Sequence, residues 1–373
     1  SEGKEGRAID ETVLRFMRYV DCASETHNER AFCEYMEREL TELGIPFERQ
    51  ELDHQIVTDG WNILAKVPGK PDKKPFLFVF HLDTVVPGNN VESYIENGRI
   101  QSRGNSVLGA DGKLAIAVVM EAVSRLLRAG EMNRPVEMLF TVCQELGLLG
   151  AKYADYSRID SEEAIVIDHY VTGEVLMCTP SRMYLHVELI GQEAHVIRDP
   201  ELGINALKTA AEIIHQIPTG QVSKDQTINV FDLVSLSQSN AIPKYARFDV
   251  EIRSFGQELL DRTNAFLQKI IKDTAAQMGC RCSVREEMDL PETDYSENKD
   301  MLKRLERIYE MTGLQMRPAR SFGILDATCT NRLGIRTIPI GMNIYYSHST
   351  REYVEVKDIK IMLDLAENIL RYF

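Results

Sequence analysis

One stretch constrains the fold of this chain more than any other: Phe76-Leu-Phe-Val-Phe-His81-Leu-Asp83-Thr-Val-Val-Pro-Gly88. Its first five residues are apolar, which predicts a strand buried on both faces, as in parallel sheets flanked by helices. His81 and Asp83 then lie at the sheet edge where open α/β folds bind ligands. Because residues i and i+2 of a strand point the same way, Asp83 can orient the imidazole of His81. A buried structural histidine beside a turn aspartate explains this stretch equally well.

Two further apolar segments repeat this pattern of a buried strand followed by polar residues. The segment 135–142 precedes Gln144 and Glu145, and the segment 164–167 precedes Asp168. A glycine-rich loop places Asp111 at the start of a long apolar helix, where a carboxylate is electrostatically favoured and a simple capping role is the commoner one. We predict that these strand ends bring the acids close to His81.

After Asp168 the pattern of the sequence changes and then returns. Six segments follow the order β-α-β-β-α-β, which is typical of a ferredoxin-like domain: 182–190, 205–217, 228–236, 245–253, 258–278 and 281–286. The alternation of helices and strands seen before Asp168 then resumes in the segments 300–312, 337–340 and 357–373. We therefore predict an α/β fold in which a catalytic domain, 1–178 and 290–373, has a mixed, largely parallel sheet flanked by helices. An α+β domain, 179–289, is inserted into it.

Composition excludes several classes of partner. The formal net charge of −14 argues against a nucleic-acid-binding face and against attraction to anionic lipid. The seven cysteines are odd in number and scattered, which predicts a reducing, cytoplasmic location rather than a disulfide framework. No apolar run is long enough for a membrane span.

A second histidine, His348, follows a strand near the end of the chain, in the polar loop Tyr346-Ser-His348-Ser-Thr-Arg-Glu352. It completes a set of two imidazoles and three carboxylates. Such a set suits a pair of Zn²⁺ ions that share one carboxylate and a water. Two ions can lower the pKa of the shared water and polarise a carbonyl, so the chemistry that we expect is hydrolysis of an amide.

The ordered motifs resemble those of the peptidase T-like members of the co-catalytic zinc exopeptidases, a family that also includes aminoacylase and glutamate carboxypeptidase. The resemblance covers nearly the whole chain and rests on these segments: His81-Leu-Asp83-Thr-Val, Gly109-Ala-Asp111-Gly-Lys113, Thr141-Val-Cys-Gln144-Glu145-Leu-Gly147, Asp168, Gly191-Gln-Glu-Ala-His195 and His348-Ser-Thr-Arg-Glu352. It implies hydrolysis of the N-terminal bond of short peptides with two Zn²⁺ or other divalent ions.

The resemblance also implies a role for each residue. Asp111 would bridge the two ions, with His81 and Asp168 completing one site and Glu145 and His348 the other. Asp83 would orient His81. The inserted domain would form a homodimer and act as a lid.

Three further residues fall in that inserted domain. His195 would reach toward the partner's active site to stabilise the oxyanion, and Asn240 and Arg253 resemble substrate contacts. An ordinary charge at a strand end is the alternative for Arg253.

Three positions depart from the family pattern. The residue before Glu145 is normally the glutamate that acts as general base, but here it is Gln144, whose neutral amide cannot carry a proton away. Loss of a general base typically costs about 10² to 10⁴ in rate. Leu325 replaces a polar residue in the turn before Asp326, and Gly112 stands where a second aspartate is common.

These departures leave three functions open. The first is a zinc-dependent tripeptidase or aminopeptidase whose activity Gln144 lowers. The second is a zinc-dependent binding protein that holds peptides without hydrolysing them. The third is a deacylase or carboxypeptidase of the same family, which differs in pocket shape.

Overall fold

The computed structural model describes residues 9–52 and 54–373, so residues 1–8 and 53 of the predicted catalytic domain lie outside the described residues. The chain forms two compact units. The first comprises the segment that ends at Met177 together with Tyr295–Arg320 and Leu325–Phe373, and the second comprises Cys178–Asp294 with Ser321–Ile324. Each unit has its own cluster of buried apolar side chains, which is what makes each compact by itself.

The main sheet has nine strands in the described residues, in the order β1-β2-β6-β3-β7-β16-β8-β14, with β15 beside β8. Its four central strands, β6, β3, β7 and β16, are parallel, and the outer strands pair antiparallel. The predicted mixed, largely parallel sheet is therefore confirmed. The strand bounds are β1 Phe47–Gln50, β2 Asn62–Val67, β3 Phe76–His81, β6 Val136–Thr141, β7 Glu163–His169, β8 Glu174–Thr179, β14 Thr293–Asp294, β15 Arg317–Arg320 and β16 Arg336–Gly341.

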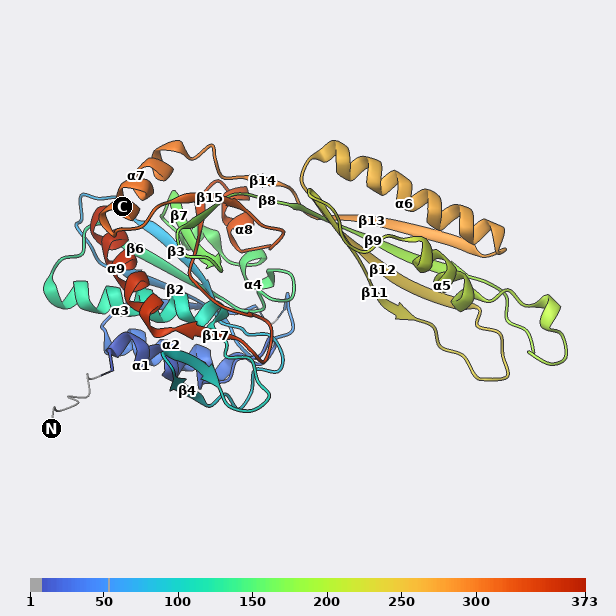
Figure 1. Ribbon diagram of the computed structural model, residues 1–373, viewed down its shortest axis with the longest axis horizontal. Coiled ribbons are helices and arrows are strands. Elements are labelled where there is room, and N and C mark those ends of the chain that lie inside the picture. The colour runs from blue at the N-terminus through green and yellow to red at the C-terminus, as the bar shows by residue number, and fades with distance from the viewer. Residues whose placement is uncertain (1–8, 53) are drawn as a thin grey trace. The chain divides into compact units, whose positions relative to one another are not determined.

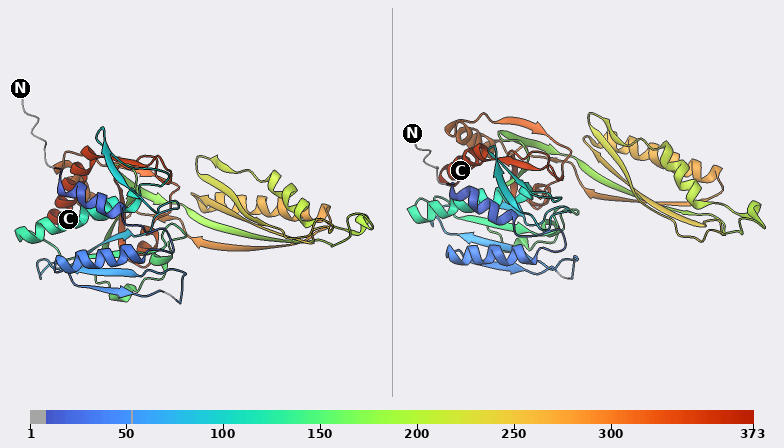
Figure 2. Two further views of the ribbon diagram at one scale, coloured as in Figure 1. Left: turned by 90° about the horizontal axis from the view of Figure 1, so that it is seen from below. Right: turned by 60° about the horizontal axis from the view of Figure 1, so that its bottom comes forward.

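Helices pack on this sheet as the apolar segments predict (Figure 1, Figure 2). The central helix, α3, lies against β3 and β7 and contacts α1 and α9, whereas α8 lies against β16 and β7 and contacts α4. α3 ends at Gly130, whose left-handed φ of 67° suits a glycine at a helix C-terminus. The helix bounds are α1 Glu11–Val20, α2 Arg30–Glu42, α3 Ala110–Ala129, α4 Leu149–Lys152, α7 Lys299–Met311, α8 Ala327–Arg332 and α9 Val356–Tyr372.

A separate three-stranded sheet in this unit has the order β17-β5-β4, with bounds β4 Ser93–Glu96, β5 Arg99–Ser102 and β17 Tyr353–Glu355. These three strands were not predicted from the sequence. The turn between β4 and β5 is Asn97-Gly98, and both residues have positive φ, as a two-residue hairpin turn requires.

The second unit is an antiparallel sheet in the order β10-β11-β12-β9-β13, packed against α5 and α6. Without β10, the chain order β9-α5-β11-β12-α6-β13 gives the ferredoxin-like arrangement that the sequence predicts. The bounds are β9 Ser181–Ile190, α5 Ala206–Gln216, β10 Gly220–Ser223, β11 Gln226–Val234, β12 Tyr245–Ser254, α6 Gln257–Gln277 and β13 Arg281–Leu290.

Two features bear on compartment and membrane. All seven cysteines are free thiols. Among the described residues, no helix combines the length and apolar character needed to cross a bilayer.

Candidate metal centre

The carboxyl ends of three neighbouring parallel strands meet at one edge of the main sheet. His81 is the last residue of β3, Asp168 lies near the end of β7, and Gln144 and Glu145 follow β6. Because β6, β3 and β7 are adjacent, their ends deliver these four side chains to a common region. The juxtaposition that the apolar strands predict is present.

Asp111 lies between two histidines at this edge. It belongs to the first turn of α3, but its ψ of 104° is not helical, so the backbone turns there instead of continuing the helix. Its Oδ1 is 3.1 Å from Nε2 of His81, and its Oδ2 is 2.8 Å from Nε2 of His348. One carboxylate therefore faces both imidazoles, one with each oxygen.

Each histidine also faces a second carboxylate. Nε2 of His81 is 3.3 Å from Oδ1 of Asp168, and Nε2 of His348 is 3.2 Å from Oε1 of Glu145. The side chain of His81 is 3% exposed and that of His348 is 45% exposed. We call His81, Asp168 and Oδ1 of Asp111 the buried half of the centre. We call His348, Glu145 and Oδ2 of Asp111 the exposed half.

The electrostatics of this cluster favour bound positive charge. Burial raises the pKa of Asp168 to about 8, and the charges of Asp111 and Glu145 add to this effect. Hydrogen bonds to Asp111 and Glu145 raise the pKa of His348 to about 10. Ligand atoms of His81, Asp111 and Glu145, which come from both halves, lie within 4.8 Å of one another, so the two halves form one compact cluster. Imidazole nitrogens and carboxylate oxygens in this arrangement suit divalent cations such as Zn²⁺.

Asp83 is buried behind His81. Nδ1 of His81 is 3.0 Å from the backbone carbonyl oxygen of Asp83 and 3.4 Å from its Oδ1. The carboxylate also accepts hydrogen bonds from the hydroxyl of Thr26 at 2.7 Å and from the backbone N–H groups of Gln144 and Glu145 at 3.0 and 3.1 Å. Burial alone would raise the pKa of Asp83, but His81 and these donors hold it below its usual value. Asp83 thus links the ends of β3 and β6.

Gln144 contacts a candidate ligand directly. Its side-chain Nε2 donates a hydrogen bond of 2.9 Å to Oδ2 of Asp168, and the residue is 6% exposed. A glutamate could make this contact only if one of the two carboxyl groups were protonated. The amide therefore holds Asp168 by a contact that an ionised carboxylate at position 144 could not make.

The other two departures have structural reasons. A Cβ atom on Gly112 would lie 2.7 Å from Nε2 of His81, so a side chain there would require the imidazole or the backbone beside it to shift. Leu325 is 3% exposed and belongs to the apolar core of the first unit. Beside it, Oδ2 of Asp326 accepts a hydrogen bond of 2.7 Å from the hydroxyl of Thr141.

The three predicted residues of the second unit make local contacts. Nδ1 of His195 accepts from the backbone N–H groups of Ile197 and Arg198 at 3.2 and 3.3 Å. Asn240 is its neighbour, because His195 pairs with Ala241 and the N–H of Val196 donates to the carbonyl of Asn240. His195 and Asn240 thus share one surface region of this unit.

Arg253 is bound on two sides within the second unit. Its guanidinium donates to both oxygens of Glu251, at 2.8 and 3.3 Å, and to the carbonyl of Phe322 at 2.9 Å. This contact also ties the short segment Ser321–Ile324 to the second unit. The role of Arg253 in binding substrate remains a prediction.

Two residues at the centre have no role in the sequence analysis. The hydroxyl of Tyr170 donates to Oδ2 of Asp111 at 2.8 Å, and Glu352 accepts from the backbone N–H groups of Gly109 and Asp111 at 2.6 and 3.4 Å. The i, i+2 argument that links His81 to Asp83 applies equally to Asp168 and Tyr170, so this signal was present in the sequence. Glu352 gave no such signal, because its partners are backbone groups far along the chain.

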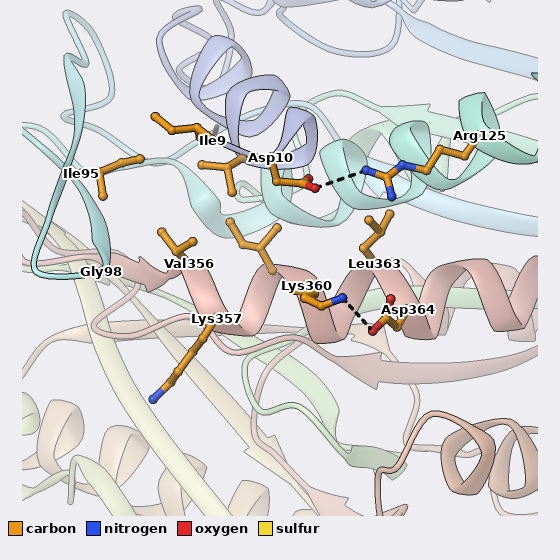
Figure 3. A pocket seen from close by; sticks show the side chains of 12 residues that line it. Ile9, Asp10, Ile95, Gly98, Arg125, Val356, Lys357, Lys360, Leu363 and Asp364 are labelled. Carbon is orange, nitrogen blue, oxygen red and sulfur yellow. Dashed lines mark hydrogen bonds and ion pairs between the residues drawn. The ribbon is translucent and has the colours of Figure 1, made fainter. Parts of the chain in front are cut away.

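An apolar groove elsewhere in the first unit contains none of these residues (Figure 3). Its volume is about 550 Å³, and apolar side chains from α1, β4 and α9 line it, with the ion pairs Asp10–Arg125 and Lys360–Asp364 at its walls. The ligand cluster, and not this groove, is the candidate for chemistry.

A sheet edge at which two histidines and two carboxylates surround one shared aspartate is typical of metal-dependent hydrolases. The chain belongs to peptidase family M20/M25/M40, whose family model matches residues 77–372.

The chain is also similar to individual proteins and solved structures. The chain is 26% identical to the uncharacterized protein YqjE of Bacillus subtilis over 92% of this chain and 93% of that protein. Its sequence is 27% identical to that of aminopeptidase PepT from Bacillus cereus. The crystal structure of that protein matches this one with a TM-score of 0.83 over 97% of this chain and 98% of that one. A tripeptidase structure from Staphylococcus aureus shares the fold, with 24% identity and a TM-score of 0.88 over 97% and 98% of the two chains.

Proposed function

We propose that this chain is a cytoplasmic, dinuclear zinc exopeptidase of the peptidase T type, which hydrolyses the N-terminal bond of short peptides slowly because of Gln144. The observation that carries this proposal is the position of Asp111, with one oxygen toward His81 and the other toward His348. Two histidines and two further carboxylates around one shared carboxylate suit a pair of divalent ions.

The residues of the chain would divide the work as follows. His81, Asp168 and Asp111 would hold one ion, and His348, Glu145 and Asp111 the other. When bound, such a pair supplies a water of lowered pKa and polarises the scissile carbonyl. Asp83 would fix the orientation of His81, and the buried strand ends would keep the ligands from moving apart.

Gln144 decides how fast such a site can work. Its amide donates to Asp168 and cannot accept the proton of the attacking water. Residual hydrolysis would then depend on solvent or another group to take that proton. This same contact favours the second candidate, a metal-loaded protein that binds peptides and does not cleave them.

The second unit would supply the lid and the dimer contact. His195 would act on the partner's active site and stabilise the oxyanion, and Asn240 and Arg253 would contact the substrate. The shared position of His195 and Asn240 in one surface region supports a joint role. Elution of the protein as a monomer at working concentration would contradict the dimer and the action of His195 in trans.

The test is zinc-dependent hydrolysis of a tripeptide panel by this chain and by its Gln144→Glu variant. We expect a gain of about 10² to 10⁴ in kcat for the variant. Acyl-amino acids assayed in parallel separate a deacylase or carboxypeptidase from an aminopeptidase. Equal rates for the two proteins would show that residue 144 is not the general base, and zinc binding without turnover by either would support the binding protein.

A further inference from the structure

Tyr170 places a phenol at the ligand cluster. It is the first residue after β7, two positions beyond Asp168, and its hydroxyl donates a hydrogen bond of 2.8 Å to Oδ2 of Asp111. It also lines a small enclosed cavity together with Asp111, Gly112 and Asp168. The phenol therefore touches the one carboxylate that both halves of the centre share.

Tyr170 is held through its backbone and its ring. Its backbone carbonyl accepts from the N–H of Ile344 at 3.3 Å. The ring stacks on His169, with 6.4 Å between centroids and 23° between planes, and Nε2 of His169 is 2.6 Å from Oε2 of Glu174. A phenol held in this way keeps its hydroxyl in one place, as a partner that orients a metal ligand must.

The contact distinguishes the two oxygens of Asp111. Tyr170 donates to Oδ2, the oxygen that faces His348, whereas Oδ1 faces His81. A carboxylate oxygen can accept at two positions, so the phenol occupies one and leaves the other for the exposed half. The hydrogen bond thus fixes the rotation of the carboxylate about its Cβ–Cγ bond.

The two halves differ in how much they need this support. His81 is almost fully buried, and Asp168 is held by Gln144 as well. His348 is 45% exposed and lies in a loop, so the exposed half has fewer fixed groups. Loss of the fixed Oδ2 should therefore weaken the exposed half more than the buried half.

We propose that Tyr170 is a positioning residue that sets the affinity of the exposed half for a divalent cation, and so decides whether the centre holds one ion or two. This inference rests on the proposed function, because it assumes that the cluster binds two ions. It concerns a residue that the ligand set does not include.

The experiment compares the full-length chain with its Tyr170→Phe variant, both stripped of metal and titrated with Zn²⁺ in a calorimeter against a competing chelator. We expect two binding events in the parent. In the variant the weaker event should lose about 10- to 100-fold in affinity, the usual cost of removing an outer partner of a metal ligand. The stronger event should stay within about threefold of the parent, well below that cost.

The matched control is Tyr156→Phe, which removes a hydroxyl that donates to the carbonyl of Ala151 at 2.7 Å, away from the ligands. It should leave both events unchanged. Absorption spectra during titration with Co²⁺ give a second readout, because the band that belongs to the second ion should appear only at higher Co²⁺ in Tyr170→Phe. Thermal unfolding of the metal-free proteins confirms that both variants fold.

Two results would overturn the proposal. One is a Tyr170→Phe titration that matches that of Tyr156→Phe. The other is an equal loss of affinity at both binding events, which would mean that the phenol supports both oxygens of Asp111 and not the exposed half alone. A parent protein that binds fewer than two ions would overturn the proposed dinuclear site together with this inference. The parent titration therefore separates failure of the proposed function from failure of the role of Tyr170.

Discussion

The two units treat their predicted functional residues differently. In the first unit the five predicted ligands contact one another: Asp111 faces both histidines, and each histidine also faces a second carboxylate. In the second unit His195 is bonded to backbone N–H groups, and Arg253 to Glu251 and a carbonyl. The first unit thus has a cluster of ligands that contact one another, while in the second unit His195 and Arg253 are each bonded to nearby groups that are not predicted site residues.

The difference follows from sheet geometry. Carboxyl ends of adjacent parallel strands meet at one edge, so acids and histidines placed there are forced into a small volume. An antiparallel sheet sends alternate strand ends to opposite edges, and its loops spread their side chains. The residues of the ligand cluster therefore depend on one another for their positions. Substitutions in the second unit can test whether that unit takes part in the chemistry.

The largest expected effect concerns His195, and it would show that the second unit also has a chemical role. If His195 stabilises an oxyanion, His195→Ala in the Gln144→Glu background should lower kcat by about 10² to 10³, the usual cost of removing one such donor. Zn²⁺ stoichiometry should not change, because His195 has no ligand contact in the structure of its unit. Steady-state kinetics and metal analysis of the same preparation check both points, and an unchanged kcat would leave the second unit without a chemical role.

A pH effect should follow from Asp326 in the first unit. Burial raises its pKa to about 6, from 3.8 in an unfolded chain. The folded carboxyl then keeps its proton between pH 4 and 6 while the unfolded one loses it, so the free energy of unfolding falls as pH rises through this window and levels off above it. The fall should be about 3 kcal/mol, from about 1.36 kcal/mol per pKa unit.

Asp326→Asn should remove this fall, because the amide stays neutral at every pH. Urea unfolding of the metal-free proteins at pH 4, 5, 6 and 7 measures it. The control is Asp72→Asn at an exposed turn position, which should keep the parent's pH profile. Parallel curves for the parent and Asp326→Asn would show that Asp326 does not titrate in this window.

A third prediction tests how strongly the ligands depend on one another for their positions. Gly112→Ala places a Cβ atom 2.7 Å from Nε2 of His81, so we expect a shift that disturbs the contacts of the imidazole with Asp111 and Asp168. We expect the affinity for Zn²⁺ at the buried half to fall about 10- to 100-fold, comparable with loss of a partner that orients a ligand. Calorimetric titration measures this loss. Gly313→Ala is the control for backbone strain without a new contact, because Gly313 has a φ of 78° but a Cβ atom there meets no atom within 4 Å. Equal affinities for the two variants would mean that His81 adjusts freely.

The smallest expected effect is in the second unit. Asn240 is exposed, and only its backbone carbonyl has a described contact, so Asn240→Ala should change the free energy of unfolding by about 0.5 kcal/mol or less. Urea unfolding measures this change. A rise in KM without a change in stability would support a substrate contact, whereas a loss of stability would assign Asn240 to the fold.

Sequence reasoning succeeded where one physical rule was sufficient. The rule for strand ends predicted that His81, Glu145 and Asp168 meet, and the order of elements predicted the ferredoxin-like topology. It did not reveal β4 and β5, although Asn97-Gly98 is a strong hairpin signal, because the strands themselves are short and partly exposed.

Other contacts depend on tertiary structure that no local pattern encodes. Glu352 accepts a hydrogen bond from the backbone N–H of Gly109 at the N-terminus of α3, although the two residues are 243 positions apart in the sequence. The bond between Gln144 and Asp168 exists only because β6 and β7 both flank β3. Whether the cluster binds two ions is a question that the titrations answer.

The way in which the second unit joins the first has an evolutionary consequence. The chain leaves through β8 and returns through β14, and the backbone N–H of Tyr295 donates to the carbonyl of Met177 at 2.8 Å. The exit and the return are thus the two arms of one hairpin, and a whole folding unit occupies the place of its turn. Such a junction allows a domain to be inserted into the first unit, or replaced during evolution, with little change to the fold of the first unit. A shortened chain with a two-residue turn from Met177 to Tyr295 would show whether the host still folds and binds Zn²⁺ alone.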